Sequence, residues 1–341
     1  MATNKKTVRV AVDAMGGDHA PGEVVAASVE AARQWGIQIS LVGDSNAVKS
    51  ELGKYDIEGL GIISVPSEGS ILEGEQPAQM LRQKPRASIL VATGLVKAGE
   101  VDAVVTMGST GAAMAAAAVL LGVIEGIDRP ALGGPIVGFA PHTAIIDLGA
   151  NVDCRPAQLL SFAVIGDVFA RQFWGIERPR IATLSVGSEA GKGNRLVKEA
   201  SELIIKSGLN FIGNVEANDL TENKADVAVC DGFVGNIVMK LTEGLAGSAE
   251  NYLRERLQGK LPSDEVEAIA REMYELGNVG EFYGGGPLLG VNGVSVVGHG
   301  RAKVDAIRRA IGMAKQTVEI GLVSNLNEEL ARAREAVGEN L

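Results

Sequence analysis

Glycine-rich turns carry most of the side chains in this sequence that could do chemistry. Three of them contain or follow a short apolar segment, and they read VRVAVDAMGGDHAP at 8–21, DLGANVDCRP at 147–156 and DGFVGN at 231–236. Functional side chains often lie where a strand ends, because the strand fixes the backbone and the loop leaves the side chain accessible. The repeated pattern predicts one shared cleft. Its candidate ionisable and amide groups are Asp13, Asp18, His19, Asn151, Asp153, Asp231 and Asn236.

Two further turns have the composition of anion-binding loops. GSEAGKGN at 187–194 follows an apolar run and precedes a helical pattern, so its backbone amides and Lys192 could hold a phosphate-sized anion. Its spacing differs from that of nucleotide-hydrolysing phosphate loops, and Gly193 stands where those loops have a metal-binding hydroxyl. GSTG at 108–111 opens an alanine-rich helix with Ser109 and Thr110, where a plain helix cap is an equally good interpretation.

The three histidines and two cysteines do not have the spacing of metal ligands. His299 lies in a glycine-rich loop after an apolar run and is the preferred catalytic histidine, with a structural role as the alternative. Cys154 and Cys230 each adjoin an aspartate, which opposes thiolate formation and argues against a covalent cysteine mechanism. We expect free thiols, no cofactor and no resident metal, although a divalent cation site is left open as an alternative, with Asp13, Asp147, Asp153, Asp226 and Asp231 as its ligands.

The elements that would position these turns alternate between strand and helix patterns. The candidate strands are short runs rich in valine and isoleucine at 8–12, 37–42, 62–65, 101–106, 143–148, 181–186, 211–215, 227–230 and 294–297. Nearly continuous apolar strands that alternate with helices indicate a parallel sheet covered on both faces. We therefore expect a three-layer α/β/α sandwich with a largely parallel sheet. One catalytic domain would span residues 7–325, and a cleft could divide it into two lobes.

Two amphipathic helical patterns occupy residues 234–276 and are joined by a short turn at 258–262. A projecting helical hairpin of this kind would serve dimer or membrane contact, and packing onto the sheet is the alternative. The remaining residues, 326–341, are rich in charge and are predicted to form a charged C-terminal tail, folded as a solvated helix.

The composition excludes several classes of protein. The formal net charge is −10 and no basic run occurs, which argues against a nucleic-acid partner. The longest run of small apolar residues, 112–124, is shorter than the roughly 20 residues that span a bilayer. The chain starts without a secretory apolar core, and its two cysteines suit a reducing compartment. We expect a cytoplasmic protein.

Several motifs, in this order, resemble those of the phosphate acyltransferase family of phospholipid synthesis. They are VDAMGGDHAP, GSTGA, RPAL, DLGANVDCRP, GSEAGKGN, GNVEAND, CDGFVGN and GGGPLLGVNGVSVVGHG. The resemblance covers nearly the whole chain. Ser109 stands where the family usually has asparagine, and Arg301 and Ala302 stand where it usually has serines.

The resemblance implies an isopropylmalate dehydrogenase-like fold that phosphotransacetylases share. It implies an enzyme that transfers a long-chain acyl group from acyl carrier protein to inorganic phosphate, forming acyl phosphate for phosphatidic acid synthesis. It also implies a homodimer with weak peripheral membrane contact through the hairpin. The alternatives are a metal- and NAD-dependent hydroxy-acid dehydrogenase of related fold and a non-catalytic scaffold for acyl carrier protein.

The resemblance suggests roles for the candidate residues. Lys192 with the amides of Gly191 and Gly193 would hold phosphate, assisted by Ser109 and Thr110. His299 or Asn236 would hydrogen-bond the oxyanion or relay a proton, and Asp13 and Asp231 would orient these donors. A basic patch that could attract the acidic carrier protein comprises Arg82, Lys84, Arg86 and Lys97.

Overall fold

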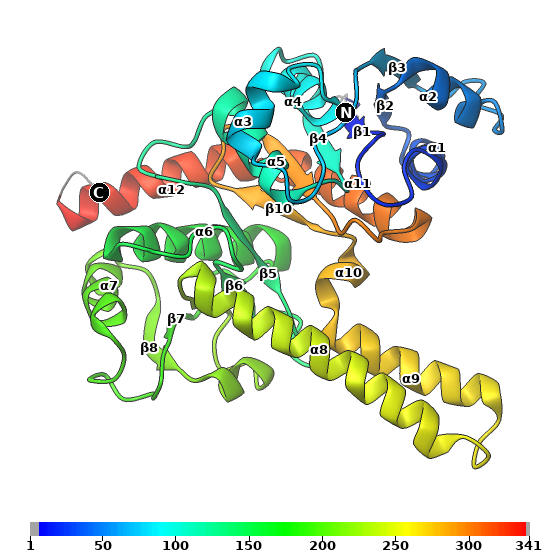
Figure 1. Ribbon diagram of the computed structural model, residues 1–341. Helices are drawn as coiled ribbons and strands as arrows, with labels where there is room; N and C mark the ends of the chain where they lie inside the picture. Colours follow the sequence, from blue (N-terminus) through cyan, green and yellow to red (C-terminus); the bar gives the residue numbers. More distant parts are fainter. Residues whose placement is uncertain (1–6, 339–341) are drawn as a thin grey trace, which may run out of the picture. The chain divides into compact units, whose positions relative to one another are not determined.

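The computed structural model in Figure 1 describes residues 7–338, which divide into two compact units. Of the described residues, the first unit consists of 7–124 together with Tyr283–Val323. The second unit consists of Glu125–Phe282 and residues 324–338. Both units are therefore discontinuous in sequence, and the chain enters each of them twice.

The sheet of the first unit has the strand order β3-β2-β1-β4-β11-β10. All neighbouring strands are parallel except β10 and β11, which are antiparallel. The strands are β1 (Arg9–Asp13), β2 (Gln38–Gly43), β3 (Ile62–Pro66), β4 (Ala103–Thr106), β10 (Gly286–Leu289) and β11 (Val294–Val297). Because β1, β4 and β11 run in one direction, the turns that follow them start at the same edge of this sheet.

Helices cover both faces of this sheet. They are α1 (Gly22–Trp35), α2 (Ser45–Leu52), α3 (Pro77–Gln83), α4 (Ser88–Lys97), α5 (Thr110–Ala116) and α11 (Val304–Glu319), and α5 continues as a π-helical turn at Ala117–Leu121. Val10 and Val12 alternate with Ala11 along β1 and belong to the core that α1 and α11 share. The other face receives α4, which contacts β1 and β2. Because successive side chains of a strand point to opposite faces of the sheet, alternate residues of β1 pack against different helical layers.

The second unit has the strand order β5-β6-β9-β7-β8, in which only the β5–β6 pair is antiparallel. The strands are β5 (Ala131–Pro135), β6 (Ala144–Ile146), β7 (Ile181–Leu184), β8 (Phe211–Val215) and β9 (Val227–Val229). The helices are α6 (Pro156–Trp174), α7 (Arg195–Lys206), α8 (Gly232–Leu257), α9 (Ser263–Gly277) and α10 (Val279–Tyr283), with a 3-10 turn at Ala217–Thr221.

Two helices sandwich the sheet of the second unit. On one face, Gly166 of α6 packs so closely on Val227 that a Cβ at this glycine would overlap the valine side chain. On the other face, Val234 and Val238 of α8 pack against the core that contains Ala228. Each unit therefore has helices on both sides of mostly parallel strands, which confirms the predicted α/β/α class.

The predicted helical hairpin is present and consists of α8 and α9, which run side by side away from the sheet of the second unit (Figure 1). Its helices are held by a contact of Gly277 with Ala246 and by the ion pair of Arg254 with Glu267 at 3.1 Å. Among residues 7–338, no helix has both the length and the apolar content that crossing a bilayer requires.

The end of the chain is helical, as predicted, but one face of this helix is buried instead of solvated. Residues 322–337 form α12 (Leu322–Val337), and residues 339–341 lie outside the described part. Leu326, Leu330 and Ala333 are buried, and Glu329 pairs with Arg171 of α6 at 3.2 Å. Apolar residues spaced three or four apart give this charged helix a buried face, which a count of its charges does not reveal.

The Gly235 position tests how α8 is seated. A Cβ at Gly235 would overlap the carbonyl oxygen of Asp147, whereas a Cβ at Gly244, on the same helix, would meet nothing within 4 Å. Gly235→Ala should destabilise the protein by about 3 kcal/mol through overpacking against backbone. Gly244→Ala should stabilise it by about 0.5–1 kcal/mol through helix propensity. Urea unfolding followed by circular dichroism measures both, and equal effects of the two variants would contradict the close seating of α8.

Candidate functional site

A buried carboxylate organises the polar edge of the first unit. Asp13, at the end of β1, is 3% exposed and accepts hydrogen bonds from the Thr106 hydroxyl at 2.7 Å and the Met15 amide at 3.2 Å. The Thr106 oxygen in turn accepts a hydrogen bond from the Gly108 amide at 2.9 Å. Burial raises the pKa of Asp13, and these hydrogen bonds oppose the rise. Asp13 thus links the first turn to the GSTG turn.

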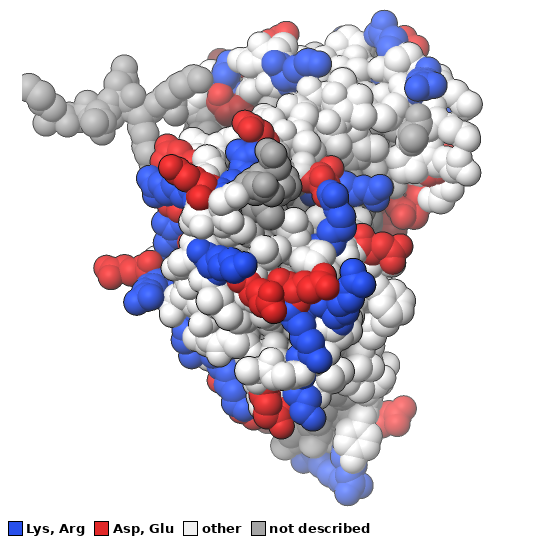
Figure 2. All heavy atoms as spheres, turned by 90° about the vertical axis from the view of Figure 1, so that its left-hand side faces the viewer, with Lys and Arg blue, Asp and Glu red and all other residues white. Residues whose placement is uncertain are grey.

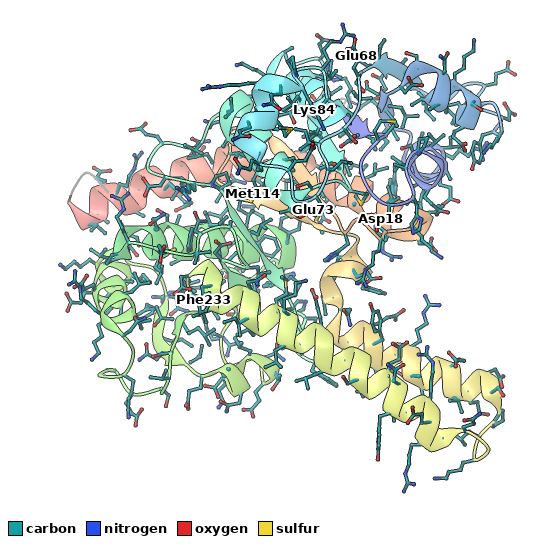
Figure 3. The ribbon with its side chains drawn as sticks, viewed as in Figure 1. Asp18, Glu68, Glu73, Lys84, Met114 and Phe233 are labelled. Carbon is teal, nitrogen blue, oxygen red and sulfur yellow. The ribbon has the colours of Figure 1, made fainter. Side chains whose placement is uncertain are left out.

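Glycines allow three turns of the first unit to pack against one another. A Cβ at Gly16 would lie 2.7 Å from the Asp13 carboxylate and 2.8 Å from the Gly108 amide nitrogen. The Asp18 amide donates to the Gly300 carbonyl at 2.8 Å, and a Cβ at Gly298 would overlap the Met107 sulfur. The turns that carry Asp13, Asp18, His19, Ser109, Thr110 and His299 are therefore in contact (Figure 3 labels Asp18).

Ser109 has the role that the cap interpretation assigns to it. Its hydroxyl accepts from the Ala112 amide at 3.4 Å, and Thr110 is the first residue of α5. Anion binding by these two residues stays a prediction. His19 is exposed and lines an open cavity of about 490 Å³ with Glu23 and Lys54.

The corresponding edge of the second unit is built around Asp147. This residue directly follows β6, is fully buried, and accepts hydrogen bonds from the amides of Leu132, Gly149, Ala150 and Asn151 and from the Asn151 side chain, at 2.7–3.3 Å. Burial raises the pKa of Asp147, and the hydrogen bonds favour its charged form. The carboxylate fixes the DLGANVDCRP loop and ties it to the RPAL segment.

Asn151 joins this loop to the start of α8. Its side-chain amide also donates to the Pro130 carbonyl at 3.0 Å, and its own carbonyl accepts from the Gly232 amide at 2.7 Å. Asp231 caps α8 by accepting from the Val234 amide at 2.9 Å. A Cβ at Gly149 would lie 3.3 Å from the side-chain oxygen of Asn236. The structure therefore brings Asn151, Asp231 and Asn236 together, with Asp153 exposed on the same loop.

The environment of both cysteines disfavours a thiolate. Cys154 and Cys230 are free, and the Cys154 thiol lies 3.3 Å from the Asn151 carbonyl oxygen. Burial, with Asp147 and Asp231 nearby, raises the pKa of Cys154 to about 11. Burial raises the pKa of Cys230 as well. No group of three or more histidine, cysteine, aspartate or glutamate side chains within residues 7–338 has the arrangement of a metal site.

The GSEAGKGN loop connects β7 to α7. Lys192 is exposed, its amide donates to the Glu189 carbonyl at 2.9 Å, and Asn194 caps α7 through the Val197 amide. Gly193 has a φ of 102°, which favours glycine. Because β6, β9 and β7 are parallel neighbours, this loop starts at the same sheet edge as Asp147 and Asp231.

Three polar residues with structural roles at these edges are absent from the predicted catalytic and phosphate-binding residues, and only Asp147 is among the aspartates named as alternative cation ligands. Thr106 links Asp13 to the GSTG turn, Asp147 holds its own loop, and Asn214 of β8 donates to the Glu189 carbonyl at 3.0 Å. Thr106 and Asp147 stand at the ends of apolar runs, which is a usable signal, whereas nothing local marks Asn214.

The predicted basic patch is partly neutralised. Lys84 pairs with Glu75 at 2.8 Å and Arg86 with Glu68 at 2.9 Å (Figure 3 labels Lys84 and Glu68). Arg82 and Lys97 are exposed. Figure 2 shows basic and acidic side chains interspersed on the face it presents.

Comparison with solved structures defines the class of fold. A phosphotransacetylase from Streptococcus pyogenes aligns with a TM-score of 0.63 at 18% identity, covering 92% of this chain and 95% of that one. A 4-hydroxythreonine-4-phosphate dehydrogenase from Klebsiella pneumoniae aligns with a TM-score of 0.54 at 16% identity, covering 93% of this chain and 99% of that one. The chain thus has the α/β fold that these enzymes share.

Sequence comparison then gives the family. Residues 8–325 match the family described as fatty acid synthesis protein, and the chain belongs to this family. Proteins named phosphate acyltransferase are 42% identical in Pelotomaculum thermopropionicum, with 95% of each chain covered, and 43% identical in Desulforamulus reducens, with 95% of this chain and 97% of the other covered. The resemblance to phosphate acyltransferases is confirmed, and the protein is an enzyme.

The raised pKa of Cys154 predicts slow alkylation. At pH 8 the native protein should react with iodoacetamide about two orders of magnitude more slowly than a free cysteine of pKa about 8.5, because the thiolate is the nucleophile. Mass spectrometry of quenched samples measures the rate. The same protein in urea should label at both cysteines within minutes, and fast labelling of Cys154 in the native state would contradict its protonated environment.

Proposed function

We propose that this enzyme transfers a long-chain acyl group from acyl carrier protein to inorganic phosphate and releases acyl phosphate for phosphatidic acid synthesis. The observation that carries the proposal is the family match over nearly the whole chain. The GSEAGKGN loop supports it, because Lys192 forms no ion pair with any other residue in the described part of the chain and stands on an exposed glycine-rich loop. A lone ammonium on such a loop suits a small anion.

The proposed reaction is a single acyl transfer. A phosphate oxygen attacks the thioester carbonyl carbon, the C–O bond forms, and the C–S bond breaks with its electron pair on sulfur. The thiolate leaves without a strong acid, since a free thiol has a pKa of about 8.5, and it is then protonated by solvent. Positioning of phosphate and stabilisation of the oxyanion supply most of the catalysis.

The site residues have the following proposed roles. Lys192 with the amides of Gly191 and Gly193 binds phosphate. His299 or the exposed Asn236 amide hydrogen-bonds the oxyanion, or His299 relays a proton. The contacts of the two aspartates support orienting roles, because Asp13 fixes the Thr106–Gly108 turn and Asp231 caps the helix that carries Asn236.

The activity is tested with palmitoyl acyl carrier protein and purified enzyme, with and without phosphate. Free carrier thiol and hydroxylamine-trapped acyl phosphate are measured together. Phosphate-dependent formation of both supports the proposal. Thiol release without trapped acyl phosphate indicates a thioesterase, and no release from folded protein indicates a scaffold or a dehydrogenase.

Lys192→Ala should raise the KM for phosphate by about tenfold or more and leave the KM for the carrier protein nearly unchanged, because the substitution removes a charge from the small-anion site. Lys198→Ala is the matched control, since Lys198 is exposed on α7 and forms no ion pair among the described residues. Initial rates at varied phosphate concentrations measure the effect. An equal phosphate dependence of the two variants would remove Lys192 from the site.

An exposed apolar stripe on α8 supports the proposed homodimer. Phe233, Ile237, Leu241 and Leu245 follow one another at intervals of four residues and are 49–61% exposed (Figure 3 labels Phe233). Residues spaced by four lie on one face of a helix, and a run of apolar side chains on an exposed face marks an interaction site. At the tip of the hairpin, the exposed Leu261 offers only weak membrane contact, consistent with a cytoplasmic enzyme that touches membranes peripherally.

Leu241→Glu should weaken the dimer at least about tenfold, because a carboxylate would be buried without a partner. Ile205→Glu places the same charge at a 63% exposed apolar position of α7 and should leave the association unchanged. Sedimentation velocity over a concentration series measures the dissociation constants. A monomeric wild-type protein, or an unaltered Leu241→Glu dimer, would rule out this interface.

A further inference from the structure

The side chain of Asn214, which belongs to β8, links this strand to the GSEAGKGN loop. Its Nδ2 atom donates to the Glu189 carbonyl at 3.0 Å and to the Lys192 carbonyl at 3.4 Å. Its Oδ1 atom accepts from the Thr183 hydroxyl at 2.7 Å. Thr183 is fully buried on the neighbouring strand β7, so the amide is fixed with its nitrogen toward the loop.

These two contacts determine where the loop amides point. In a trans peptide the C=O group and the N–H group of the next residue point in opposite directions. The Glu189–Ala190 and Lys192–Gly193 peptides are trans. With both carbonyls turned toward Asn214, the amides of Ala190 and Gly193 are directed to the opposite side of the loop.

The loop has unused backbone donors. Within residues 7–338, the amides of Ala190, Gly191 and Gly193 donate no hydrogen bond to any other group. The Lys192 amide is different, because it closes a turn with the Glu189 carbonyl. Backbone amides that point to the same side of a loop form a concave anion-binding site, and a nearby lysine adds positive charge. The amides can point to that side only if the preceding carbonyls point to the other.

We propose that Asn214 is the positioning residue of the phosphate site. It acts through the Glu189 and Lys192 carbonyls, which it holds so that the loop amides face inorganic phosphate. The inference rests on the proposed function, since it takes phosphate to bind at this loop. It adds a residue from the GNVEAND segment, 20 or more positions away in the sequence, to a site that the local motif alone does not complete.

The test compares two asparagines on adjacent parts of the chain. Asn214→Ser removes the two donors to the loop and adds no charge. Asn210→Ser removes a similar amide, which donates to the Arg178 carbonyl at 3.1 Å and does not contact the loop. Asn214→Thr is a second variant that also lacks the amide, and threonine is favoured in β-strands. It allows the test to be completed if Asn214→Ser folds poorly. Thermal unfolding establishes that each variant is folded.

Asn214→Ser and Asn214→Thr should raise the KM for phosphate by about tenfold, with kcat at saturating phosphate within about twofold of the wild type. Asn210→Ser should change neither constant. An unchanged phosphate KM, or a fall in kcat alone, would overturn the positioning role.

Lys192→Ala, measured in parallel, separates failure of the inference from failure of the proposed site. If Lys192→Ala raises the phosphate KM and the Asn214 variants do not, the loop binds phosphate without help from Asn214. If none of these variants changes the phosphate KM, phosphate binds elsewhere and both proposals fail.

Discussion

The buried carboxylate of Asp147 holds together the polar edge of the second unit. Moving a carboxylate out of water costs several kcal/mol, and a hydrogen bond to a charged group returns about 1.5–3 kcal/mol. Five N–H donors, at 2.7–3.3 Å, are therefore enough to keep the group inside. The donors come from residues 132–151, and Asn151 extends the connection to Gly232. The Asp147 side chain thus helps to position the RPAL, DLGANVDCRP and CDGFVGN motifs, and through the last of these it positions the start of α8.

Asp13 has the same relation to the first unit. Asp13 also lies at the end of a parallel strand and is buried. It accepts hydrogen bonds from Thr106, at the end of the neighbouring strand β4, and from the amide of Met15 in its own turn. Both carboxylates are buried and hydrogen-bonded, which suits the orienting roles that we propose for such groups, and the proposed function assigns contact with the substrates to exposed groups such as Lys192 and Asn236. Buried carboxylates that hold a loop in place keep the loop rigid, while polar groups on its outer surface stay accessible.

Much of this arrangement could be predicted from the sequence, because apolar runs followed by glycine and polar residues mark the ends of parallel strands. The α/β class, the helical hairpin and the polar turns follow from that pattern. The roles of Thr106 and Asn214 do not, because the Thr106 side chain contacts a residue 93 positions away and the Asn214 side chain contacts residues 22–31 positions away. Helix α12 shows the converse problem, since its charged residues conceal the periodic apolar face of Leu326, Leu330 and Ala333. Whether one cleft unites the two sets of turns stays a prediction.

The discontinuous first unit has a consequence for synthesis on the ribosome. β4 ends at Thr106, but its second neighbour, β11, begins only at Val294. While the intervening chain is being made, β4 has an unpaired edge, and edges of this kind invite pairing with other chains. The β1–β4 part of the sheet therefore stays incomplete until β11 has been synthesised, and its open edge is exposed to aggregation until then.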